Sequence, residues 1–174
     1  MNKKDFNNIS MNGRLAYQLM CLEKYLSTKY PTRDFSDLMS LLWQGTNGLY
    51  WNEFADYVMD LSPSNMTEFD SYEKQEWLIL SKELYDTLFP CIQGLDSNVD
   101  SLFSTLKDQS YIYEGTVIPL PGKESIDIVF ETIKILKENN ISLPDISKVQ
   151  FSTINQFNGW GNPFDGTTLS IIIK

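Results

Sequence analysis

Apolar side chains recur along most of this chain at spacings of three and four residues, which is the period of one face of an α-helix. Leu15, Leu19, Leu22 and Leu26 form the clearest stripe, over about three helical turns. The same period predicts further helices at 36–45, 51–61, 72–89, 92–106 and 123–139, with Pro90 and Cys91 as the entry turn of the fifth. The pattern therefore predicts a mainly α protein: a single helical domain of about six helices, spanning residues 1–174.

Two parts of the chain lack this helical period. Residues 111–113 and 116–118 are rich in β-formers, so a small hairpin and an ordered loop are equally defensible there. In the last 25 residues, 149–151 and 169–173 are each short enough for one extended piece. We therefore expect minor β-strand decoration and an irregular C-terminal segment.

The segment 157–166 combines successive turn signals with three aromatic residues, Phe157, Trp160 and Phe164. A tight turn of this kind can present its rings to a partner. It can equally bury them against the helices as a C-terminal lid, and we favour the lid, because burial of large rings offsets the entropy lost on ordering a loop.

The composition, 42% hydrophobic and 21% charged over 174 residues, suits one compact soluble domain. Polar residues interrupt every apolar run before the roughly 18 residues needed to cross a bilayer, and no signal peptide is readable, so we expect a cytoplasmic protein without membrane contact. The formal net charge of −9 disfavours direct binding of nucleic acid, which depends on Lys and Arg at the phosphates.

The residue types needed for most catalytic sites are missing. The sequence has no histidine, so Ser-His-Asp and Cys-His arrangements are excluded, and Cys21 and Cys91 alone cannot form a closed zinc site. Both cysteines lie in apolar helical patterns, which favours buried free thiols over a disulfide. No glycine-rich phosphate loop is present. We therefore expect no cofactor, no metal and no enzymatic activity, although a pair of carboxylates could still act as general acid and base.

The negative charge is concentrated in residues 34–100. This segment holds 13 acidic residues against Lys74 and Lys82, a net charge of −11, whereas the rest of the chain carries +2. Solvated helix faces kept for solubility are one explanation. The other is a field that steers a cationic partner into contact and raises its association rate. On that second explanation we predict a partner-binding surface made of seven residues: Glu53, Asp56, Asp60, Glu68, Asp70, Glu73 and Glu76.

Several short motifs resemble those of small bacterial immunity proteins from polymorphic-toxin and contact-dependent growth inhibition systems. They comprise Asn12-Gly13-Arg14-Leu15-Ala16-Tyr17, Cys21-Leu22-Glu23-Lys24, Leu42-Trp43 with the following Trp51, and the ending Asn158-Gly159-Trp160-Gly161-Asn162-Pro163-Phe164-Asp165-Gly166-Thr167. The resemblance implies a cytoplasmic protein that binds the toxin domain of a cognate effector and blocks its active site. Many such toxins are nucleases with basic clefts, some directed at transfer RNA, and an acidic inhibitor surface would replace the phosphates there.

Our leading hypothesis is an immunity protein that occludes a cationic nuclease toxin domain with its acidic surface. One alternative is a metal-dependent hydrolase built on clustered carboxylates, for which Mg²⁺ is the natural cation because it prefers oxygen ligands. The other is an acidic adaptor that binds a different basic protein.

Overall fold

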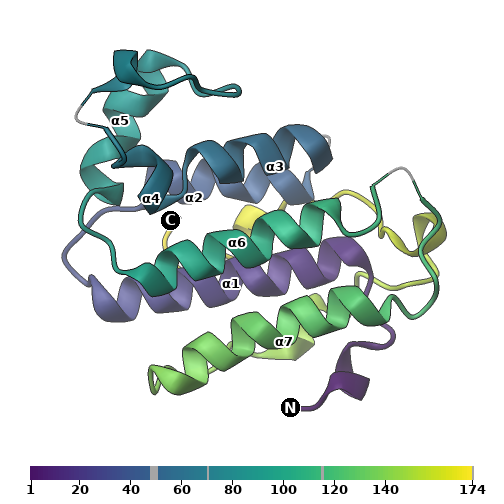
Figure 1. Ribbon diagram of the computed structural model, residues 1–174. Coiled ribbons are helices and arrows are strands. Elements are labelled where there is room, and N and C mark those ends of the chain that lie inside the picture. Colours follow the sequence, from purple (N-terminus) through teal and green to yellow (C-terminus); the bar gives the residue numbers. More distant parts are fainter. Residues whose placement is uncertain (48–50, 70, 115, 174) are drawn as a thin grey trace.

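The structure, a computed structural model, describes residues 1–47, 51–69, 71–114 and 116–173, with only the backbone described at residues 51 and 52. These residues form a mainly α fold, as predicted (Figure 1). The α-helices are α1 (Met11–Lys29), α2 (Ser36–Leu42), α3 (Trp51–Asp60), α4 (Pro63–Met66), α5 (Lys82–Ile92), α6 (Ser97–Tyr111) and α7 (Lys123–Glu138). Short 3-10 helices connect them: η1 (Lys3–Phe6), η2 (Trp43–Thr46), η3 (Tyr72–Lys74), η4 (Ile146–Val149), η5 (Phe157–Gly159) and η6 (Gly166–Leu169).

Helix α1 is the centre of the fold. It packs against α6 and α7, and α3 packs against α6 on the far side from α7 (Figure 1). The predicted stripe of Leu15, Leu19, Leu22 and Leu26 is fully buried in the core. Fifteen of the 19 residues of α1 are buried, so this helix is enclosed on nearly all sides. A helix enclosed in this way must find partners inside the protein for its polar side chains.

Two of those polar side chains tie α1 to its neighbours. The Arg14 guanidinium donates hydrogen bonds to the carbonyl oxygens of Phe6 (3.1 Å), Gly122 (2.9 Å) and Pro121. Burial lowers the pKa of Arg14 to about 10. The Gln18 amide donates to the hydroxyl of Thr132 on α7 (3.0 Å). These bonds fix both the N-terminal turn and the loop before α7 on the central helix.

The C-terminal segment is irregular, as expected, and returns to α1. The buried carboxylate of Glu23 accepts hydrogen bonds from the Trp43 indole N–H (2.9 Å), the Ile171 backbone N–H (2.8 Å) and the Ser170 hydroxyl. Gly166 lies directly against the Trp43 ring, where an added Cβ would collide with it. One carboxylate of the core therefore holds the end of the chain in place.

The predicted helix at 72–89 is wrong in its first half. Residues 75–81 are not helical, and α5 begins only at Lys82, where the Ser81 hydroxyl caps it by accepting the Leu84 N–H (3.3 Å). The reason is tertiary, because the backbone N–H groups of residues 78–80 bond to the side chain of Asp60 in place of a helical turn.

The boundary predicted at Pro90 is also misplaced. Pro90 and Cys91 lie inside α5, and α6 begins after Asp96, whose carboxylate accepts the Asn98 N–H (2.9 Å). Cys21 and Cys91 are both free, which confirms the prediction of free thiols, but only Cys21 is buried.

Extended structure is nearly absent from the described residues, where it is limited to one isolated antiparallel bridge between Ile9 and Thr153. Of the two possibilities at 111–118, the described part forms a loop and not a hairpin, and the pieces at 149–151 and 169–173 form no strand. None of the helices in the described ranges has the length and apolar character needed to cross a membrane.

Candidate functional site: an acidic groove

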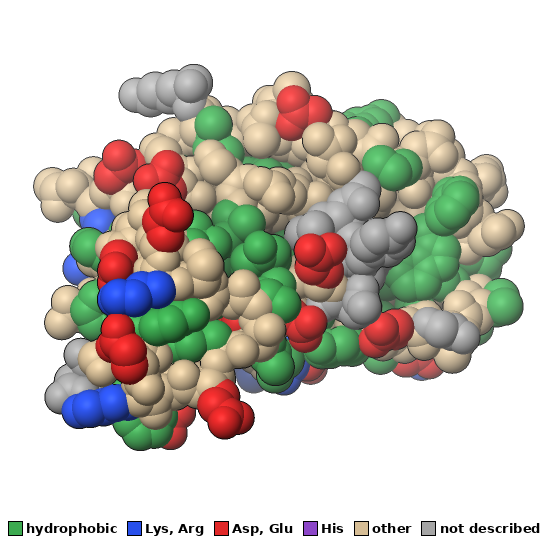
Figure 2. Space-filling model, turned by 90° about the horizontal axis from the view of Figure 1, so that it is seen from above, with side chains coloured by type: hydrophobic (Ala, Val, Ile, Leu, Met, Phe, Trp, Pro, Cys, Tyr) green, Lys and Arg blue, Asp and Glu red, His purple; other side chains and the backbone are tan. Residues whose placement is uncertain are grey.

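A groove with a volume of about 890 Å³ opens between α3, α4, α6 and residues 68, 76 and 78. Four acidic residues line it: Asp60, Glu68, Glu76 and Asp100. The fold thus gathers three of the seven residues predicted as the partner surface and adds one, Asp100, from the first turn of α6. Figure 2 shows the molecule from above, with acidic side chains spread across this side and the visible Lys and Arg side chains mainly near its left edge.

Asp60 corrects the prediction of an exposed acidic row on α3. It is only 2% exposed, and its carboxylate accepts the backbone N–H groups of Leu78 (3.1 Å), Ile79 (2.9 Å) and Leu80 (2.9 Å). Asp60 therefore builds a groove wall and does not present a free charge. A signal was available in the sequence, because a carboxylate in the last turn of a helix is unfavourable beside the helix dipole and so implies donors nearby.

Glu68 and Glu76 lie on the rim of the groove and are exposed, as predicted. Glu73 is also exposed, but it lies outside the groove and pairs with Lys82 (3.4 Å). A hydrogen bond to its own backbone N–H, with help from Lys82, holds the pKa of Glu73 below its usual value. Asp70 lies outside the described residues.

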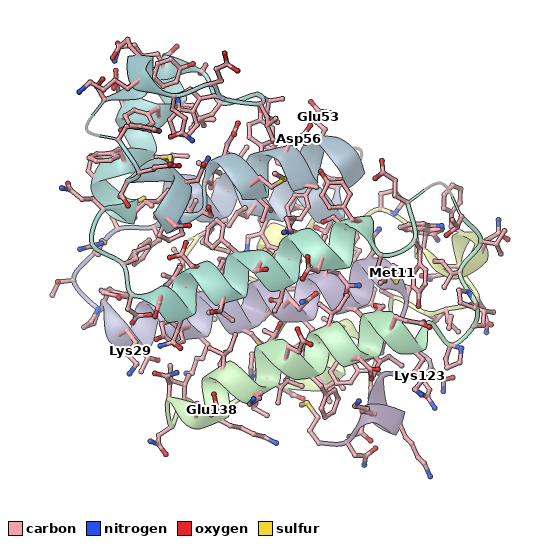
Figure 3. All side chains as sticks on the ribbon, viewed as in Figure 1. Met11, Lys29, Glu53, Asp56, Lys123 and Glu138 are labelled. Carbon is pink, nitrogen blue, oxygen red and sulfur yellow. The ribbon has the colours of Figure 1, made fainter. Side chains whose placement is uncertain are left out.

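Glu53 and Asp56 remain on α3 but do not line the groove (Figure 3). Glu53 is exposed, whereas Asp56 is half-buried and accepts a long hydrogen bond from the Tyr111 hydroxyl (3.4 Å). The predicted surface is therefore divided: Glu68 and Glu76 share one groove, and the exposed Glu53 and Glu73 lie beyond it.

The groove also has apolar walls, which the charge pattern did not predict. Val58 and Phe103 are buried beneath it, while Met59 and Leu78 are 39% and 54% exposed. Large apolar side chains exposed beside one another are typical of interaction sites. Sequence reasoning missed Leu78 because this residue lies in the first half of the helix predicted at 72–89, and that half does not form.

The wall at 71–80 is tied to its neighbours by specific contacts. The Gln75 amide donates to the Asn65 side-chain oxygen on α4 (2.6 Å), and Asp100 of α6 accepts the Ser64 backbone N–H of α4 (2.7 Å). The rings of Tyr72 and Trp77 stack with centroids 5.5 Å apart. Together with the Asp60 carboxylate, these contacts connect the wall to α3 and α4, and α4 to α6.

The groove suits the binding of cations. Glu68 and Glu76 have no side-chain hydrogen bond or ion pair to any other described residue. Across the described ranges, no three His, Cys, Asp or Glu side chains come close enough together to hold a metal ion. The groove therefore offers two exposed carboxylates over an apolar floor, a chemistry suited to the side chains of a basic protein.

The aromatic turn at 157–166 packs two of its rings against the protein and leaves the third exposed. Phe164 packs on the main core and Trp160 on a smaller cluster around Met11, as the lid interpretation predicted. Phe157, in contrast, is 71% exposed and holds a left-handed backbone conformation (φ 44°). The turn lies at the opposite end of the molecule from α5 (Figure 1).

Comparison with protein-family models, with curated proteins and with solved structures found no match for this chain.

Proposed function

We propose that this chain is an immunity-type inhibitor that captures a cationic toxin domain in its acidic groove and so blocks the toxin's active site. The observation that carries the proposal is that the exposed carboxylates of Glu68 and Glu76 line the same groove as the exposed apolar side chains of Met59 and Leu78. A nuclease cleft is lined with Lys and Arg because its substrate is a polyanion. The exposed carboxylates of Glu68 and Glu76 can take the place of the phosphates.

The charge distribution supports capture at a high rate. Residues 34–100 carry a net charge of −11, and this field extends beyond the groove through exposed residues such as Glu53 and Glu73. Such a field raises the association rate of a cationic partner. An inhibitor of a nuclease acts where the nucleic acid is, so the proposal implies a cytoplasmic protein.

Growth protection tests the proposal directly. The chain is co-expressed in bacteria with the product of any toxin gene found beside its own gene, and with a panel of nuclease toxin domains as specificity controls. We expect survival with the neighbouring toxin alone, and loss of protection when Glu68 and Glu76 are both replaced by Lys. A matched reversal at Glu131 and Glu138, which are exposed on α7, should leave protection intact.

Two results would contradict the proposal: failure to protect against every nuclease domain, or full protection by the Glu68→Lys/Glu76→Lys variant. Binding of a basic protein without growth protection would favour the adaptor alternative.

A further inference from the structure

The acidic groove is lined by both charged and apolar side chains, and these two kinds of lining indicate what kind of segment it binds. Glu68 and Glu76 supply carboxylates on the rim, and the exposed side chains of Met59 and Leu78 lie beside them. We propose that the groove binds a segment of the partner in which a lysine or arginine lies next to a large apolar side chain. The cation contacts Glu68 and Glu76 while the apolar side chain covers Met59 and Leu78; this inference rests on the proposed function and names the partner element.

The size of the groove fits such a segment. Ligand sites that bury most of a drug-sized molecule have volumes of about 300–1,000 Å³. The groove, at about 890 Å³, lies near the upper end of that range, so it has room for more than one side chain. A long cationic side chain also needs an apolar surface for its methylene stem, and Met59 and Leu78 provide one.

The carboxylates of the groove divide into two pairs. Asp60 accepts the backbone N–H groups of residues 78–80 in the wall, and Asp100 accepts the backbone N–H of Ser64 on α4. Glu68 and Glu76 make no such side-chain bonds within the described residues, so their oxygens are available to a partner's N–H donors. Because the wall is already fixed, binding should cost little ordering entropy in this chain.

One basic residue, Lys107 of α6, lines the groove within the described part of the chain. Its ammonium lies 3.6 Å from the Asp108 carboxylate. Lys107 repels an incoming cation and weakens the field of Glu68 and Glu76. Removing this charge should therefore strengthen binding, a gain that a merely structural role for the groove does not predict.

Fluorescence anisotropy with three labelled peptides tests the inference on the intact chain. The first peptide alternates Lys and Leu, the second replaces Lys by Glu, and the third replaces Leu by Ser. We expect the lysine-leucine peptide to bind, and each of the other two to bind at least about tenfold more weakly, a difference of about 1.4 kcal/mol.

Variants of the chain locate the binding. Glu68→Gln/Glu76→Gln and Leu78→Ser should each weaken binding of the lysine-leucine peptide about tenfold, and Lys107→Gln should tighten it about threefold. Glu131→Gln and Lys137→Gln, exposed on α7, are the matched controls and should change nothing. Met59→Gln provides a second apolar test, and circular dichroism confirms that each variant is folded.

Equal binding of the lysine-serine peptide, or no effect of Leu78→Ser and Met59→Gln, would overturn the inference. The growth assay distinguishes failure of this inference from failure of the proposed function. Protection that survives Leu78→Ser and Met59→Gln, but is lost in Glu68→Lys/Glu76→Lys, leaves the proposed function standing and contradicts the inference about the apolar side chain. Peptide binding with the expected pattern would support the inferred specificity of the groove. If the chain nevertheless protects against no toxin, the proposed function is contradicted.

Discussion

At the scale of single residues, the carboxylates of residues 34–100 have two different roles. Asp60 is buried and satisfies three backbone N–H groups, so it holds the wall that carries Leu78. Glu68 and Glu76 are exposed in the same groove, and their carboxylates make no side-chain hydrogen bond to another described residue. The buried carboxylate thus positions the groove, and the exposed ones give it its charge.

Replacing Asp60 by Asn should destabilise the protein. The amide has one acceptor oxygen where the carboxylate has two, and its NH2 group would face backbone N–H donors, so we expect a loss of about 2–4 kcal/mol in the free energy of unfolding. Urea denaturation measures this loss. Asp56→Asn, on the same helix, is the control and should cost no more than about 0.5 kcal/mol.

An unchanged free energy of unfolding for Asp60→Asn would show that the three hydrogen bonds do not hold the wall.

The charge of the site could be predicted from the sequence, but its geometry could not. Residue spacing identified Glu68 and Glu76 as part of an acidic surface. It could not separate them from Asp60, because burial depends on where residues 78–80 return in space. Leu78 and Met59 were missed for the same reason, since the exposure of an apolar side chain is decided by tertiary packing.

At the scale of elements, α1 concentrates weak acids in the core. Tyr17, Cys21 and Tyr25 follow one another at four-residue spacing, and all three are buried. Burial raises the pKa of Tyr25 to about 12, with a contribution from its hydrogen bond to Asp96, and it raises the pKa values of Tyr17 and Cys21 as well. Each group therefore stays protonated in the folded protein at a pH where it ionises in the unfolded chain.

This difference predicts a loss of stability at alkaline pH. A phenol of the unfolded chain ionises near pH 10, whereas Tyr25 does so near 12, so the unfolded state binds fewer protons between these values. Stability should be unaffected by these groups below about pH 8, where the Cys21 thiol of the unfolded chain is still protonated, and should fall as the pH rises through 9 to 12. The urea midpoint, measured as a function of pH, checks the slope.

Absorbance at the tyrosinate band is the companion measurement. Ionisation of all nine tyrosines in one step near pH 10 in the folded protein would contradict the burial of these phenols.

The C-terminal segment depends on α1 through Glu23. Replacing Glu23 by Gln leaves one acceptor oxygen for three donors, so we expect a loss of about 2–3 kcal/mol. Hydrogen exchange at the Ile171 amide, which donates to Glu23, should become faster than in a Glu131→Gln control. Equal exchange in both variants would show that the segment is held by packing alone.

Helical periodicity was sufficient to predict the elements of the core, since α1, α3 and α7 fall where the apolar stripes place them. It was insufficient at 72–81, where the apolar residues have a helical spacing but the backbone bonds to Asp60. A local pattern cannot show that a distant side chain competes for the same N–H groups.

At the scale of the whole molecule, the groove is not the only exposed apolar surface among the described residues. The turn at 157–166 lies at the opposite end of the molecule from α5 (Figure 1). The exposed residues Val117, Leu120 and Phe157 belong to the loop before α7 and the turn at 157–159. The account therefore predicts that a cationic partner covers one end of the molecule and leaves the other free.

The most direct test is a hydrogen-exchange footprint of the chain with the toxin domain against which it protects. Our account predicts slower exchange, on binding, in the residues around the groove, at 58–68, 76–80 and 100–107, and no change at 116–122 or 157–161. Protection confined to 116–122 and 157–161, with the groove unchanged, would contradict the central claim that the acidic groove is the surface that captures the partner.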